Sequence, residues 1–119
     1  MATRPRRIIV GYDGSDASAR ALDVAADLVG YGSTLVVVTV RTSESDDWMA
    51  AGAREQLQGR LVEAGYHETR GEPAKQLVKK AHELRADLLV IGRRNGSSLL
   101  GSVSSKVVRR ADCDVLVVR

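Results

Sequence analysis

The sequence has little cysteine and few aromatic residues. Cys113 is the only cysteine among 119 residues, so an intramolecular disulfide and a zinc site with several cysteines are both excluded. A single thiol also suits a reducing compartment. The chain has no phenylalanine, one tryptophan and three tyrosines. Its core must therefore be built from valine, leucine, isoleucine and alanine.

Long hydrophobic runs are also absent. The longest, residues 35–40, is interrupted by Thr39 and falls far short of the roughly 20 residues that a membrane-spanning helix needs. The basic start, residues 1–7, is followed by only three apolar residues, too few for a signal peptide. We therefore expect a soluble, cytoplasmic protein that does not enter a membrane.

Size and charge predict one globular domain, residues 1–119. The chain is 44% hydrophobic and 28% charged, a balance typical of soluble domains, and its length leaves no room for a second core. The net charge of +3 would suit phosphates, nucleic acid or solubility alone, and solubility is the simplest explanation. Nucleic acid is an unlikely partner, because the chain has neither stacking aromatic residues nor a recognised binding motif.

Short apolar runs mark the strands. Residues 8–10, 35–40, 87–91 and 115–118 are apolar almost throughout, a pattern typical of strands buried on both faces of a parallel sheet. Residues 66–70 are polar and are expected only as an edge strand.

Helical periodicity fills the gaps between these strands. Ser15 is expected to cap the first helix and Gly30 to end it, while Pro73 fits the first position of the third helix. The second helix is expected to continue to Gly65. Its apolar face would comprise Met49, Ala53, Leu57, Leu61 and Ala64. The apolar residues of a short fourth helix would be Val103, Val107, Val108 and Ala111.

Strict alternation of strands and helices predicts an α/β fold, a single doubly wound five-stranded parallel sheet with helices on both faces. In such sheets, ligands bind beyond the carboxyl ends of the strands where the strand order reverses. Three segments are expected at that edge: residues 11–15, 40–42 and 92–102.

The third segment is rich in glycine and serine, contains Arg93 and Arg94, and leads into a helix at Ser102. Glycines let backbone amides approach an anion, and a helix N-terminus adds partial positive charge. The segment is therefore a candidate phosphate site. A plain loop with a solvated arginine pair and a capping serine would have the same composition. Neither a P-loop nor a Rossmann glycine fingerprint is present.

Several motifs occur in a specific order along nearly the whole chain. Ile-Ile-Val-Gly-Tyr-Asp-Gly-Ser spans residues 8–15, Gly-Glu-Pro spans 71–73 and Ala-Asp-Leu-Leu-Val-Ile-Gly spans 86–92. Gly-Ser-Val-Ser follows at 101–104 and Val-Leu-Val-Val at 115–118. Together these segments resemble the universal stress protein family.

The resemblance implies a strand order of 3-2-1-4-5, a homodimer joined through the final strands and a protein partner yet to be identified. Many members bind ATP through a Gly-x2-Gly-x9-Gly-Ser/Thr signature. Carried over, Asp13 and Val40 would hold adenine and ribose. The phosphate would be held by Gly92, Gly101, Ser102 and Val103, with Mg²⁺ present only alongside the nucleotide.

The signature is altered in this chain. Asn95 stands where the second glycine is expected, although Gly96 follows it, and only five residues instead of nine precede Gly101. The loop is therefore about four residues short. It would accommodate a smaller nucleotide, AMP or ADP, or would not hold a triphosphate. Asp114 replaces the proline that usually precedes the last strand, a change expected to affect the loop and not the ligand.

Two functions follow from these observations. The first is an adenine-nucleotide-binding regulatory homodimer in the stress response, in which Asp13 contacts the nucleotide; an aspartate that merely forms the turn before Gly14 is the alternative. The second is an interaction protein of the same fold that binds no nucleotide. No nucleophile lies beside a general base in the sequence, so at most slow, incidental ATP hydrolysis is expected. Cys113 is expected to be a partly buried thiol.

Overall fold

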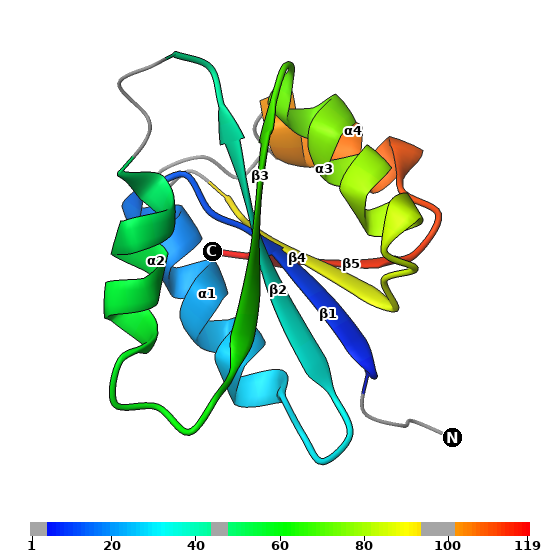
Figure 1. The fold of residues 1–119 in the computed structure, drawn as a ribbon. Helices are drawn as coiled ribbons and strands as arrows, with labels where there is room; N and C mark the ends of the chain where they lie inside the picture. The colour runs from blue at the N-terminus through cyan, green and yellow to red at the C-terminus, as the bar shows by residue number, and fades with distance from the viewer. Residues whose placement is uncertain (1–4, 44–47, 94–101) are drawn as a thin grey trace.

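The computed structural model describes residues 5–43, 48–93 and 102–119. Five parallel strands form one sheet in the order β3-β2-β1-β4-β5, as the resemblance implied (Figure 1). Their bounds are β1 Arg7–Gly11, β2 Thr34–Arg41, β3 Ala64–Arg70, β4 Leu88–Gly92 and β5 Asp114–Val118. The strand order reverses between β1 and β4, which are neighbours in the centre of the sheet.

Four helices cover the two faces of the sheet. Helices α1 (Asp16–Leu28) and α2 (Met49–Leu57) lie on one face, and α3 (Pro73–Glu83) and α4 (Ser102–Arg110) lie on the other (Figure 1). Each pair of helices packs on its own cluster of buried apolar residues. The predicted doubly wound architecture is therefore confirmed.

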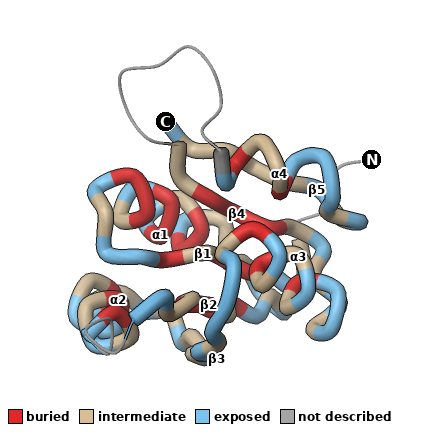
Figure 2. The backbone as a smooth tube through the Cα atoms, turned by 90° about the horizontal axis from the view of Figure 1, so that it is seen from above, coloured by how far each residue is buried: buried red, intermediate tan, exposed pale blue. Residues whose placement is uncertain are grey.

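Successive side chains of the central strands point to opposite faces of the sheet, so the core is divided into two layers, one under each pair of helices. Val10 and Val37 face α1 and α2, whereas Ile9 and Val38 face α3 and α4. All four side chains are fully buried. Figure 2 shows that buried residues concentrate on the central strands and on the helix surfaces that face them. Aliphatic side chains dominate both clusters, as the shortage of aromatic residues required.

The starts of α1 and α3 follow the predicted chemistry, whereas α1 ends at Leu28 with Val29, not Gly30, as its C-cap. The Ser15 hydroxyl accepts a hydrogen bond from the Ser18 N–H at 3.1 Å and so caps α1. Pro73 opens α3, and the Glu72 carboxylate caps it by accepting from the Lys75 N–H at 3.2 Å. Residues 66–70 belong to β3, which lies at one edge of the sheet as expected.

The predicted end of the second helix is wrong. Helix α2 ends at Leu57, and Gly59 adopts a φ of +85° that takes the chain out of the helix. Leu61 is fully exposed, and Ala64 begins β3. The apolar spacing of Leu61 and Ala64 continued the helical period by coincidence, because it crosses a turn.

The predicted apolar face of the fourth helix is only partly buried. Val107 is completely buried, but Val103 and Val108 are exposed. Helix α4 lies over the β5 edge of the sheet and beside α3, so only a narrow stripe of its surface is covered. Ser104, next to that stripe, is also buried.

Other expectations concern membranes, metals and the thiol. Within the described residues, we find no helix with the length and apolarity needed to cross a membrane. The same residues contain no group of three side chains suited to hold a metal ion. Cys113 is a free, partly buried thiol, and burial raises its pKa with a smaller contribution from Asp112.

Candidate functional site

A cleft of about 460 Å³ opens at the carboxyl ends of β1, β2 and β4. It lies where the strand order reverses, the position at which open α/β sheets bind ligands. Its volume is within the range of roughly 300–1,000 Å³ that is usual for small-molecule sites. The three segments that the sequence pointed to therefore supply walls of one cavity.

Four of the predicted site residues line this cleft: Asp13, Val40, Gly92 and Val103. They come from the ends of three strands and from the first turn of α4. Ser102 is the first residue of α4 and directly precedes Val103. The other predicted positions Arg94, Asn95, Gly96 and Gly101 lie outside the described residues.

Arg93 is not among the residues that line the cleft. Its backbone N–H donates to the Val118 carbonyl at 2.7 Å, which ties the end of β4 to β5. Its Nε is buried and has no hydrogen-bond partner among the residues that the structure describes. Arg93 therefore follows the lining residue Gly92 but does not itself belong to the wall of the cleft.

Asp13 sits in a tight turn between β1 and α1. Its Oδ1 accepts a hydrogen bond from the Ser15 N–H at 2.9 Å, an arrangement that stabilises such turns. Gly14 occupies the left-handed region with a φ of +83°. The aspartate therefore has the turn-forming role, and it is also one of the residues that line the cleft. The two interpretations of this residue are compatible.

The Ser18 side chain stabilises the same turn. Its hydroxyl donates to the Ser15 carbonyl at 3.0 Å and accepts from the Asp13 N–H at 3.2 Å. The side chain is buried, so these bonds are shielded from water. The Tyr12 N–H donates to the Val38 carbonyl at 3.0 Å and extends the pairing of β1 with β2 up to the turn. Asp13 is thus anchored on both sides.

Burial also affects the ionisation of Tyr12. The ring is almost completely buried, and that burial, together with the nearby Asp13 and Glu55, raises the pKa of its hydroxyl. Tyr12 therefore stays neutral at physiological pH. Its hydroxyl packs against Gly52 of α2, where an added Cβ would lie only 3.2 Å from it.

Apolar side chains form much of the cleft wall. They are Val38, Val40, Met49, Leu77 and Ile91. Met49, Leu77 and Ile91 are buried and come from α2, α3 and β4, so three elements separated in sequence converge here. This part of the cleft suits a flat apolar group such as a purine ring.

Other features of the cleft suit an anion. The first turns of α1, α3 and α4 contribute Ser15, Pro73 and Ser104 to the lining, and helix N-termini carry partial positive charge. Helix α1 has Asp16 in its first turn and α3 is capped by Glu72, whereas α4 has no acidic residue there. The start of α4 is thus the most favourable position for a phosphate.

Glu72 is itself partly neutralised. Its carboxylate oxygens lie 3.8 Å from Lys106 Nζ and 3.9 Å from Arg110 Nη1, both on α4. The pairs are exposed and so contribute little to stability. They nevertheless reduce the negative charge beside Pro73, which lines the cleft.

Gly92 is required by close packing. A Cβ at this position would overlap the backbone carbonyl of Ala17 in α1, and backbone atoms cannot turn aside as a side chain can. Glycine here lets the first turn of α1 lie directly against the end of β4. Gly11 is also closely packed, but against a side chain: an added Cβ would lie 3.0 Å from Leu77 Cδ2.

The sequence reasoning missed several lining residues. Gly11, Tyr12, Ser15 and Thr42 line the cleft within the segments that were expected at this edge. The residues that were missed are Ala17, Ser18, Val38, Met49, Pro73, Leu77, Ile91 and Ser104. Many of them had been assigned to strands, caps or helix faces, with no sign that they would meet. The available signal was topological: helices that follow β1, β3 and β4 all begin at the same edge of the sheet.

Comparison with known proteins agrees with this architecture. Residues 5–119 match the sequence model of the Universal stress protein family. A universal stress protein of Mycobacterium tuberculosis is 33% identical over 139 aligned positions, covering 95% of both chains. One from Thermus aquaticus is 34% identical, with 96% of this chain and 98% of that protein covered. The alignment of 139 positions exceeds the 119 residues present, so that relative contains stretches that this chain lacks.

Solved structures show the same fold. A universal stress protein in complex with cAMP superposes with a TM-score of 0.84 at 30% identity, covering 98% of each chain. One from Archaeoglobus fulgidus gives a TM-score of 0.81 at 28% identity, with 96% of this chain and 93% of that one covered. Sequence match, strand order and superposition agree, and the chain belongs to the universal stress protein family.

Proposed function

We propose that this protein binds an adenine nucleotide in the cleft between β1 and β4. The observation that carries the proposal is that one cleft combines apolar walls with the start of a helix that has no acidic residue in its first turn. Its apolar walls, built around Val40 and Met49, would hold an adenine ring, Asp13 would contact the ribose, and the start of α4 would hold the phosphate. The relative with 30% identity is a complex with cAMP, an adenine nucleotide.

The phosphate end sets the size of the ligand. The loop before α4 is about four residues shorter than the family signature requires, so fewer backbone amides are available to surround a triphosphate. We therefore expect nucleotides with one phosphate or two to bind at least as well as ATP. Any Mg²⁺ would enter with a bound triphosphate.

We also propose a regulatory homodimer formed through β5, acting in the stress response through a protein partner. β5 lies at an edge of the sheet, and all four of its apolar residues, Val115 to Val118, are only partly buried. An apolar edge strand tends to pair with another chain. Pairing two copies along this strand would cover these side chains and place the two clefts in one assembly.

Calorimetric titration tests nucleotide binding. The purified protein is titrated with ATP and Mg²⁺, ADP, AMP and cAMP. Binding of at least one of them supports the proposal. No heat with any of the four, for a protein shown by circular dichroism to be folded, would contradict it and favour an interaction protein that does not bind nucleotides.

Three variants locate the site. Asp13→Asn keeps the Oδ1 that accepts from Ser15 but removes the charge, and we expect a loss of affinity of about tenfold, typical of a weakened bond to a charged group. Gly101→Val, directly before α4, should weaken binding of the phosphate. Asp27→Asn is the matched control, because Asp27 pairs with Arg60 on the surface of α1, away from the cleft.

A further inference from the structure

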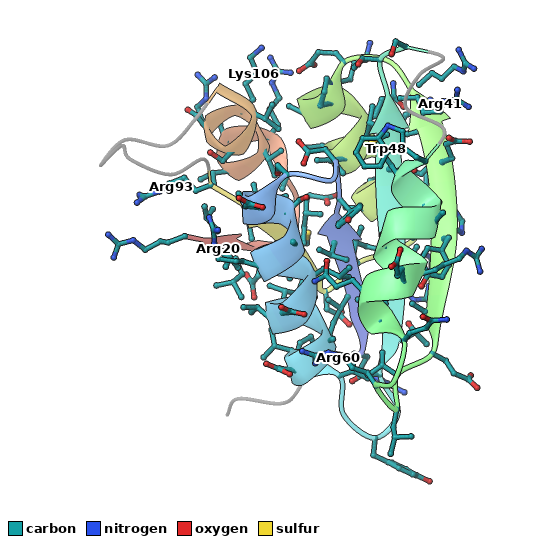
Figure 3. All side chains as sticks on the ribbon, turned by 90° about the vertical axis from the view of Figure 1, so that its left-hand side faces the viewer. Arg20, Arg41, Trp48, Arg60, Arg93 and Lys106 are labelled. Carbon is teal, nitrogen blue, oxygen red and sulfur yellow. The ribbon has the colours of Figure 1, made fainter. Side chains whose placement is uncertain are left out.

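Trp48 is the only tryptophan in the chain, and it packs against the turn that carries Asp13. It precedes α2, and its carbonyl accepts from the Gly52 N–H at 3.0 Å. Its indole ring lies directly over Gly14, where an added Cβ would overlap ring atoms Cη2 and Cζ3. Figure 3 shows the ring at the start of α2. The side chain is nevertheless half exposed.

The contact lies on the outer side of the turn. Asp13 and Ser15 line the cleft, whereas Gly14 and Trp48 do not. The turn therefore has the cleft on one side and the indole ring on the other. The Asp13–Ser15 hydrogen bond and the Ser18 hydroxyl stabilise the turn through residues that are close in sequence. Trp48 contacts the turn from a segment that is distant in sequence.

The residue next to Trp48 contributes to the cleft directly. Met49 is buried and belongs to the apolar wall. The start of α2 is thus connected to the site by two consecutive residues. Trp48 contacts Gly14 of the turn, and Met49 forms part of the cleft wall. Any displacement of the start of α2 would alter both contacts together.

We propose that Trp48 is a positioning residue for the ligand and acts through the Asp13 turn. The inference rests on the nucleotide-binding function proposed above. Gly14 has no side chain and a left-handed φ, so this turn is intrinsically free to adopt other conformations. The ring restricts that freedom and holds the Asp13 carboxylate towards the cleft before the ligand arrives. Such preorganisation increases affinity because less ordering remains to be done on binding.

The test compares Trp48→Ala with Trp48→Phe, titrated with whichever of the four nucleotides binds the unmodified protein. Trp48→Ala is expected to lose affinity about tenfold through lost preorganisation. Trp48→Phe keeps an aromatic ring over Gly14 and should recover most of that loss. Trp48→Leu replaces the alanine variant if the latter does not fold, since it keeps an apolar contact without the ring.

A double-mutant cycle with Asp13→Asn separates positioning from a general loss of stability. If the ring acts through Asp13, the two losses of affinity are less than additive. Unchanged affinity of Trp48→Ala, or fully additive losses, would overturn the inference while leaving nucleotide binding intact. Absence of binding in the unmodified protein would instead refute the proposed function, so the two failures are distinguishable.

Discussion

At the scale of single residues, two glycines shape the site for different reasons. Gly14 adopts a left-handed φ, and Gly92 lies against backbone atoms of α1. The first is a conformational requirement and the second a requirement for space. Both place the first turn of α1 against the cleft, which Asp13 and Ser15 line.

Replacing Gly92 tests the requirement for space. Gly92→Ala should destabilise the protein by about 1–3 kcal/mol, the usual cost of overpacking, because the Ala17 carbonyl cannot move aside without displacing α1. The free energy of unfolding in urea measures this change. Gly65→Ala is the control, since its Cβ would meet only Val36 Cγ2 at an ordinary 3.8 Å. Equal effects of the two substitutions would contradict the close contact of β4 with α1.

At the scale of elements, α2 is shorter than its sequence period predicts. Leu57 and Leu61 are four residues apart and would share a face of one continuous helix. In the structure Leu57 is buried in the core, whereas Leu61 is fully exposed after the turn at Gly59. The early end of α2 leaves residues 58–63 to connect it to β3, which pairs with β2 from Ala64 onward.

The two leucines therefore respond differently to truncation. Leu57→Ala should lower the free energy of unfolding by about 2–5 kcal/mol, because it leaves a cavity under α2. Leu61→Ala should change it by less than about 0.5 kcal/mol, as expected for an exposed side chain. Chemical denaturation of both variants measures the difference. Similar losses for the two would mean that the helix continues past Gly59.

At the scale of the whole molecule, the doubly wound topology creates the cleft. Each of β1, β2 and β4 ends at the same edge of the sheet, and α1, α3 and α4 begin there. The site therefore combines segments that are up to about ninety residues apart in the chain. The proposed dimer would join two such sites through β5, at the edge of the sheet next to β4.

Oligomeric state tests the role of β5. We expect the unmodified protein to sediment as a dimer at micromolar concentrations. Val118→Lys should raise the dissociation constant at least about tenfold, because a lysine on an edge strand opposes pairing with another chain. Leu61→Lys introduces the same charge at a fully exposed position away from β5 and should leave the dimer intact. A monomer in the unmodified protein would exclude the proposed assembly.

Much of the fold was predictable because its signals are local. Continuous apolar runs predicted four of the five strands, since a strand buried on both faces must be apolar at every position. Ser15 and Pro73 predicted the starts of two helices through their own hydrogen bonding and backbone geometry. The resemblance to the family assigned Asp13, Val40, Gly92 and Val103 to one site, and all four line the cleft.

Other features depend on packing between elements, which no local pattern encodes. The periodicity of apolar residues did not reveal that Leu61 lies beyond the end of α2, because the same spacing continues across the turn at Gly59. Nothing in the residues around Trp48 indicates that its ring rests on Gly14, or that Ala17 approaches Gly92. Such contacts depend on how closely each helix packs against the sheet. That distance is decided only when all the side chains of the core are packed together.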